Sequence, residues 1–189
     1  MTRQEAIAFD NELKYKLMEA GNKYGLGKEM GADIVDNYII VMPDEERKGM
    51  IFLGNESASY KGGNIKLDFK KAIVAGMELT ASINMPESVF SYIQLLIVGA
   101  FFIQKSTKEE LNNLEAYIVY FLHIRDAYTI GIQEEQFMDE FQSWYWEQEG
   151  KALELKEITE AVNHLYRIQT VDIVEGIIYL KEYVIWKVK

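Results

Sequence analysis

The chain has 189 residues, of which 49% are hydrophobic and 13% aromatic, and its formal net charge is -10 at pH 7. This apolar content excludes an intrinsically disordered chain, because enough side chains are present to offset the conformational entropy that folding removes. The chain contains no cysteine. Disulfides, thiolate metal sites and cysteine nucleophiles are therefore excluded, which fits a reducing compartment.

Membrane insertion is not expected. Charged side chains at Arg3, Glu5 and Asp10 interrupt the N-terminus, which therefore lacks the apolar core of a secretion signal. The most apolar stretch, residues 89–103, is shorter than the roughly 20 apolar residues that span a bilayer. We expect a buried core helix in this stretch, no membrane contact and a cytoplasmic protein.

Negative charge is concentrated in the middle of the chain. Residues 1–105 carry a net charge of -2 and residues 106–150 carry -8, whereas acidic and basic side chains balance in residues 151–189. We expect the middle segment to dominate any electrostatic attraction of a partner.

The start of the chain predicts a helix followed by a small β-hairpin. Apolar residues recur at helical spacing over residues 6–17 and predict a first helix that ends before the glycine cluster at residues 21–31. Residues 34–41 are typical of a strand, residues 43–49 of a charged turn and residues 50–53 of a second strand.

Three helices are predicted next. Helical and alternating strand patterns compete over residues 68–83, and we favour the helix. Pro86 suits the first turn of a second helix, which continues to Ile103. Ser106 or Thr107 is a candidate cap for a third helix that extends to about residue 126.

Two further helices follow a short extended piece at residues 128–132. Phe137, Phe141 and Trp144 give helical spacing to residues 133–146. The next helix covers residues 153–169, where apolar residues recur at steps of three and four. These residues are Leu155, Ile158, Val162, Leu165 and Ile168.

The last part of the chain predicts a second β-hairpin. β-Branched and aromatic residues dominate residues 171–174 and 177–188, and Glu175 and Gly176 between them suit a tight turn. The apolar tail around Trp186 extends the second strand, and we expect it to pack against the N-terminal half and tie both halves into one unit.

The order of elements from Thr107 onward is helix, short strand, helix, helix, strand, turn, strand. This order resembles a winged helix-turn-helix domain, with residues 153–169 as its third helix and residues 175–176 as the wing tip. The resemblance covers residues 106–189 and leaves residues 1–105 as an N-terminal portion. We therefore expect an α+β fold, in which N-terminal helices and a small β-hairpin precede a winged-helix-like portion of three helices plus a β wing.

The resemblance implies contact with DNA, because such domains usually place the third helix in the major groove and flank it with the wing. It also implies a homodimer. Glutamates at positions 154, 157 and 160 line the front of this helix, and residues 172 and 175 add carboxylates to the wing, which opposes binding to phosphates. The candidate DNA-binding residues are Lys151, Lys156, Asn163, His164, Arg167 and Lys181.

An aromatic cluster offers a different kind of surface, because Trp144, Tyr145 and Trp146 cannot all face one core from a single helix. One interpretation is that Trp144 packs inward and the other two cover the base of the hairpin. The other is that the cluster is a partner or dimer interface, since exposed Trp and Tyr often anchor binding. The candidate partner-binding residues are Glu134, Glu135, Asp139, Glu140, Trp144, Tyr145 and Trp146.

Motifs of catalysis and cofactor binding are absent from the sequence. The chain has neither a phosphate-binding loop nor a dinucleotide fingerprint, and no serine lies in a nucleophile-elbow setting. The two histidines, His123 and His164, have no metal-ligand spacing, although His123 and Asp126 could pair across one helical turn. We expect no catalytic residue, no metal site and no cofactor.

The sequence therefore favours a non-enzymatic regulatory or accessory protein that acts by macromolecular binding, mainly through protein–protein contacts of the winged-helix-like portion. One alternative is a DNA-binding transcriptional regulator. Another is an acidic inhibitor that mimics DNA and presents carboxylates to a basic nucleic-acid-binding site. Basic residues gathered beside Asn163 and Arg167 would favour DNA binding, and a continuous carboxylate surface along residues 134–149 would favour mimicry.

Overall fold

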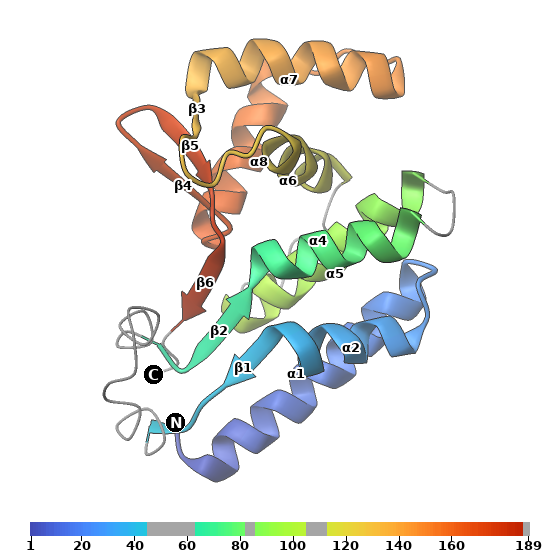
Figure 1. Ribbon diagram of the computed structural model, residues 1–189, viewed down its shortest axis with the longest axis vertical. Helices are drawn as coiled ribbons and strands as arrows, with labels where there is room; N and C mark the ends of the chain where they lie inside the picture. The colour runs from blue at the N-terminus through green and yellow to red at the C-terminus, as the bar shows by residue number, and fades with distance from the viewer. Residues whose placement is uncertain (45–62, 82–85, 105–112, 187–189) are drawn as a thin grey trace.

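The computed structural model describes residues 1–44, 63–81, 86–104 and 113–186, which form an α+β protein, as predicted (Figure 1). The described helices are α1 (Arg3–Lys23), α2 (Lys28–Tyr38), α4 (Phe69–Ala81), α5 (Pro86–Gln104), α6 (Asn113–Ile124), α7 (Glu134–Glu149) and α8 (Leu155–Arg167). The strands are β1 (Ile39–Val41), β2 (Ile65–Asp68), β3 (Ile132–Gln133), β4 (Val171–Val174), β5 (Ile177–Leu180) and β6 (Tyr183–Trp186).

Helices α1 and α2 pack closely at the N-terminal end of the chain (Figure 1). The hydroxyl of Thr2 accepts a hydrogen bond from the Glu5 N–H, and the Glu5 carboxylate accepts one from the Thr2 N–H, so a capping box starts α1. A Cβ added to Gly31 would lie 2.2 Å from the Leu17 carbonyl oxygen. The glycine cluster predicted to follow the first helix therefore lets two helices approach, and α1 continues through Gly21.

The strand predicted at residues 34–41 is wrong for most of its length. Helix α2 continues to Tyr38, and only the last three residues form β1. Ile34 and Val35 are buried, and their branched side chains fill the core from a helix despite their preference for strands. The partner strand predicted at residues 50–53 lies outside the described residues.

The first antiparallel sheet joins distant parts of the chain in the order β1-β2-β6. Ile39 lies opposite Leu67, which in turn lies opposite Val184, and all three side chains are buried. The predicted strand over residues 177–188 is therefore two strands: β5 belongs to the second sheet, and β6 crosses to the first. Trp186 on β6 is buried in the core, which confirms that the tail packs against the N-terminal half.

Helices α4 and α5 confirm two predictions. Within the ambiguous residues 68–83, residues 69–81 form α4, Asp68 ends β2, and the last two residues lie outside the described ones; α5 begins at Pro86. One window of α5, Glu87–Gln104, is apolar and long enough to span a membrane by composition, but 56% of it is buried inside the protein. Tyr92 packs so closely against Gly76 of α4 that a Cβ there would lie 2.1 Å from its ring. These contacts place α5 at the centre of the core, as expected for residues 89–103.

The C-terminal part consists of α6, β3, α7, α8, β4 and β5 in chain order, and its antiparallel sheet has the strand order β3-β5-β4. The extended piece predicted at residues 128–132 is reduced to Ile132 and Gln133. The turn at Glu175 and Gly176 is confirmed, since both residues adopt positive φ, at 51° and 75°. The predicted caps at positions 106 and 107 lie outside the described residues.

A polar contact joins the two parts where β5 leads into β6. The Lys70 N–H at the start of α4 donates to the Glu182 carbonyl over 3.0 Å, and its ammonium donates to the Glu182 carboxylate over 2.8 Å. Buried residues of α1, α5, α6, α8 and both sheets form one continuous core. The C-terminal part is therefore fixed to the N-terminal part by shared packing as well as by β6.

Candidate functional site

Helix α7 lies along one end of the molecule and carries the candidate partner-binding residues (Figure 1). The Glu134 N–H donates to the Gly176 carbonyl over 2.8 Å, which fixes the start of the helix against the hairpin. Glu134 and Glu135 lie in the first turn, where their negative charges interact favourably with the positive end of the helix dipole. Gly150 ends the helix in a left-handed conformation, and its N–H donates to the Trp146 carbonyl over 2.8 Å.

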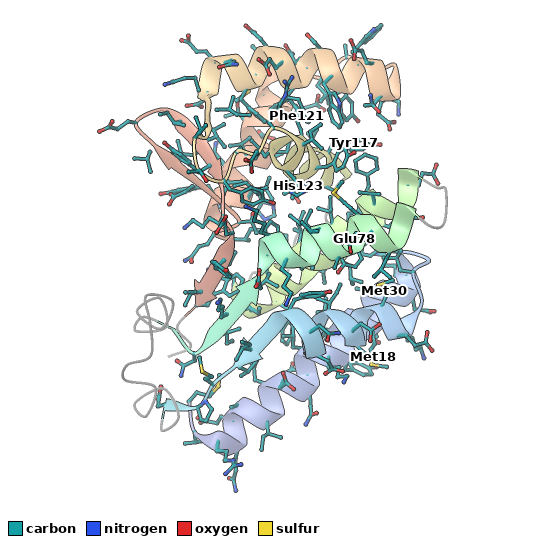
Figure 2. The ribbon with its side chains drawn as sticks, viewed as in Figure 1. Met18, Met30, Glu78, Tyr117, Phe121 and His123 are labelled. Atoms are coloured by element: carbon teal, nitrogen blue, oxygen red, sulfur yellow. The ribbon has the colours of Figure 1, made fainter. Side chains whose placement is uncertain are left out.

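The inner side of α7 is an aromatic stripe. Phe137 and Phe141 are buried and stacked, with ring centroids 5.4 Å apart. Trp144 lies 5.4 Å from Phe121 of α6, measured between ring centroids, so the expectation that Trp144 packs inward is confirmed. Figure 2 shows Phe121 on α6 beneath α7. Trp144 holds the helix in place and is not available as a main partner contact, which corrects its inclusion in the predicted partner-binding set.

The other two aromatic residues of the cluster have different surroundings. Tyr145 is half-buried and packs edge-on against Tyr117 of α6 at 5.2 Å between ring centroids, so it does not cover the base of the hairpin. Trp146 is 57% exposed. Of the three residues in the aromatic cluster, Trp146 therefore presents the most surface to a partner.

A hydrogen bond anchors the far end of α7. The Tyr117 hydroxyl donates to the Glu149 carboxylate. Burial, followed by this hydrogen bond, raises the pKa of Tyr117 above its ordinary value, so the phenol stays protonated at neutral pH. This contact anchors the C-terminal end of α7 to α6, and the hydrogen bond from Glu134 to Gly176 anchors its start. Anchoring of both ends favours a preformed binding face.

The outer side of α7 is strongly acidic. The helix contains six acidic residues and no lysine or arginine. Glu134, Glu135 and Asp139 are exposed, whereas Glu140 is half-buried and pairs with Arg125 at 3.0 Å. Glu147 is also exposed, whereas the Glu149 carboxylate accepts the hydrogen bond from Tyr117 of α6. Exposed carboxylates therefore occur near both ends of the helix, and Trp146 is exposed between Asp139 and Glu147. We call the surface formed by residues 134, 135, 139, 146 and 147 the α7 face.

Helix α8 carries most of the candidate DNA-binding residues. A capping box between Glu154 and Glu157 starts the helix, which places two carboxylates at its front. Lys156 is exposed and lies 3.8 Å from the Glu160 carboxylate. Asn163 and Arg167 are exposed further along the helix. Lys156 thus has an acidic neighbour, Glu160. The basic cluster beside Asn163 and Arg167 that would favour DNA binding does not form on this helix.

The remaining DNA-binding candidates are dispersed. Lys151 is exposed before α8, and Lys181 follows β5, where its ammonium pairs with Asp172 at 3.4 Å. His164 is only 7% exposed, so the prediction that it contacts DNA is wrong. A residue that faces the core between α6 and α8 cannot reach a phosphate.

The surroundings of His164 explain its burial. Its Nδ1 pairs with the carboxylate of Glu115 on α6, and its ring lies 4.4 Å from the Phe101 ring of α5, measured between centroids. Glu115 is also buried. A buried carboxylate is tolerated only where it is paired, and His164 provides that pair. Sequence reasoning missed Glu115 because the two residues are 49 positions apart.

The second histidine also has a structural partner. The Nδ1 atom of His123 lies 2.6 Å from the Tyr128 hydroxyl, and this contact replaces the suggested pairing with Asp126. The Lys70 ammonium lies 4.4 Å from the centre of the Tyr128 ring. Burial, with a smaller effect of the nearby Lys70 charge, lowers the pKa of His123. Among the residues that the structure describes, no group of three or more His, Asp and Glu is placed to hold a metal ion.

The chain matches no protein-family model, no curated protein and no solved structure.

Proposed function

We propose that this chain is a non-enzymatic regulatory or accessory protein of the cytoplasm that binds another protein through the α7 face of a winged-helix-like C-terminal part. One observation carries the proposal. Trp146 is 57% exposed on a rigid helix whose six charged residues are all acidic. Exposed tryptophan in a charged rim is typical of the anchors that dominate protein interfaces.

The charge of the α7 face selects the class of partner. A row of carboxylates repels nucleic acid and anionic lipid, and it attracts a basic protein surface. Long-range attraction raises the association rate, whereas burial of the indole ring of Trp146 supplies affinity. We therefore expect the partner to have an apolar pocket surrounded by lysine and arginine.

The test uses the purified chain as bait in extract from its source cell, with quantitative mass spectrometry of the bound proteins. Trp146→Ala and Asp139→Lys change the α7 face, and Tyr15→Ala serves as a control because Tyr15 is 59% exposed on α1. Removing a hot-spot tryptophan costs at least about 2 kcal/mol, or roughly 30-fold in affinity. One basic protein should be retained by the wild type and the control and lost from both α7 variants.

Recovery of the same proteins by all four baits would contradict the proposal. Circular dichroism of each variant separates loss of binding from loss of fold. Because Trp146 and Asp139 are exposed, we expect their substitution to change the free energy of unfolding by no more than about 0.5 kcal/mol.

Binding to DNA is the second candidate, and the arrangement of elements supports it. The order α6, β3, α7, α8, β4, β5 supports this candidate, because the resemblance to a winged helix-turn-helix domain rests on that order of elements. Asn163 and Arg167 are exposed on its third helix. Titration with random-sequence duplex DNA across a salt series tests this function. Binding that weakens steeply with salt and is reduced by Arg167→Ala would favour it over protein binding.

Mimicry of DNA is a narrower form of the protein-binding proposal. The exposed carboxylates of α7 support it, because one helix without a lysine or arginine carries them all. Competition distinguishes this form: duplex DNA should displace the chain from its captured partner. A partner that binds the chain and DNA together would exclude mimicry and leave the α7 face as an ordinary protein interface.

A further inference from the structure

Three exposed residues of α7 lie on one line along its outer side. Glu135, Asp139 and Trp146 follow one another at steps of four and seven residues. At about 100° of rotation per residue, this spacing keeps their Cα atoms within an arc of about 40°, on the side opposite the buried Phe137 and Phe141. All three side chains are exposed. We call the surface formed by Glu135, Asp139 and Trp146 the outer stripe.

The two carboxylates of the outer stripe are available to a partner. Two other carboxylates of α7 are already engaged within the chain: Glu140 pairs with Arg125 at 3.0 Å, and Glu149 accepts a hydrogen bond from α6. Within the described part of the chain, the side chains of Glu135 and Asp139 have neither an ion-pair partner nor a hydrogen-bond donor. Each can therefore pair with a lysine or arginine of another protein.

The charged and apolar contacts of the outer stripe are separated along the helix. At a rise of about 1.5 Å per residue, Trp146 lies about 10 Å beyond Asp139 toward the C-terminal end of α7. Two polar side chains between them are bound to backbone carbonyls. The Gln142 amide donates over 2.8 Å to the segment before α8, and the Ser143 hydroxyl donates over 3.0 Å to residue 139. The outer stripe thus has a charged end and an apolar end.

The shape of this end of the molecule indicates the form of the partner surface. Helix α7 is the outermost element there, and it contacts α6, β3 and β5 from outside (Figure 1). A single helix in this position presents a convex surface, to which a groove is complementary. The outer stripe spans about 16 Å along the helix axis. A partner must therefore be concave over about that length to contact both ends of the stripe.

We propose that α7 binds in a groove of a basic protein in one fixed direction. Two lysine or arginine side chains of the partner pair with Glu135 and Asp139, and an apolar pocket about 10 Å further along the groove receives the indole ring of Trp146. Charge complementarity selects a basic partner, because α7 contains six acidic residues and no basic one. The inference rests on the proposed function and adds the direction and the spacing of the contacts.

The test uses the basic protein that the wild-type bait retains, identified by its mass spectrum, purified and immobilised for surface plasmon resonance. Glu135→Gln combined with Asp139→Asn should lower the affinity roughly tenfold, mainly through slower association, because two ion pairs are lost. Glu134→Gln combined with Glu147→Gln is the matched control. It removes two exposed carboxylates from the same helix outside the outer stripe, and it should lower the affinity by no more than about threefold.

Moving single side chains along α7 tests the spacing. Trp146→Ser combined with Ser143→Trp keeps the composition and the charge but moves the indole ring about 4.5 Å toward the charged end. Its dissociation rate should rise at least about 30-fold, as in Trp146→Ala. Asp139→Ser combined with Ser143→Asp moves one carboxylate by a helical turn and should lower the affinity roughly threefold. All these positions are exposed, so circular dichroism should show an unchanged fold.

The outcomes separate the direction of binding from binding itself. Equal loss of affinity in the two double variants that remove carboxylates would overturn the inference and leave the proposed function standing. So would wild-type dissociation of the variant with Trp146→Ser and Ser143→Trp, because the position of the indole ring would then not matter. A wild-type bait that retains no basic protein would overturn both the inference and the proposed function.

Discussion

Replacing Val184 with alanine is expected to destabilise both parts of the protein together. Val184 is buried on β6, opposite Leu67 in the first sheet. Removal of two methyl groups costs about 1.6 kcal/mol at roughly 0.8 kcal/mol per buried CH₂. The cavity left behind adds to this cost, so we expect about 2–3 kcal/mol. At about 2–4 °C per kcal/mol for a chain of this length, Tm should fall by about 4–12 °C.

The positions of the three tryptophans allow each part to be followed separately. Trp186 reports on the first sheet, whereas Trp144 and Trp146 report on α7. One reporter protein carries Trp144→Phe and Trp146→Phe, and the other carries Trp186→Phe. Urea unfolding followed by tryptophan fluorescence then gives one transition from each part. Since one continuous core joins the parts, Val184→Ala should shift both transitions.

A shift confined to the Trp186 reporter would refute this reasoning. It would show that β6 stabilises only the first sheet and that the C-terminal part folds independently. Val174→Ala is the matched control, because it removes the same two methyl groups from a side chain that is half exposed at the end of β4. We expect this control to shift either transition by no more than about 0.5 kcal/mol.

Two other predictions concern helix packing and pH. Gly31→Ala should lower the free energy of unfolding, measured in a thermal melt, by about 1–3 kcal/mol, because the new Cβ would meet the backbone of α1. Gly99→Ala is the comparison: its Cβ would have ordinary contacts at 3.5 Å or more, so the free energy of unfolding should stay the same or rise by up to about 1 kcal/mol. The opposite order of melting temperatures would contradict the close contact of α1 and α2. The pKa of His123 is lowered in the folded state, so the unfolded chain binds this proton more readily. The contribution of neutral His123 to the free energy of unfolding should therefore be fully present above about pH 6.5 and be lost as the pH falls below it. In urea titrations between neutral and mildly acidic pH, the free energy of unfolding of His123→Gln should decrease less than that of the wild type. Equal decreases in the two proteins would exclude the effect.

Local spacing was sufficient to predict several elements. The start of α5 at Pro86 and the turn at Glu175 and Gly176 match the structure. The apolar steps of α8 are buried as predicted from Ile158 onward, whereas Leu155 at the start of the helix is 54% exposed. Each depends on residues within one or two turns of each other, and a pattern of that kind is read directly from the chain. The same applies to Trp144, whose spacing from Phe137 and Phe141 places it on the inner side of α7.

Other features depend on contacts that local patterns do not contain. Residues 177–188 satisfy strand preferences throughout, and only the pairing of Tyr183 with Asp68 on β2 reveals that a second strand begins there. Burial of Ile34 against other helices overrides its preference for a strand. His164 is an intermediate case, because it lies three residues after the buried Ala161 and on the same helix face. That spacing could have predicted an inward position, although not its pairing with Glu115.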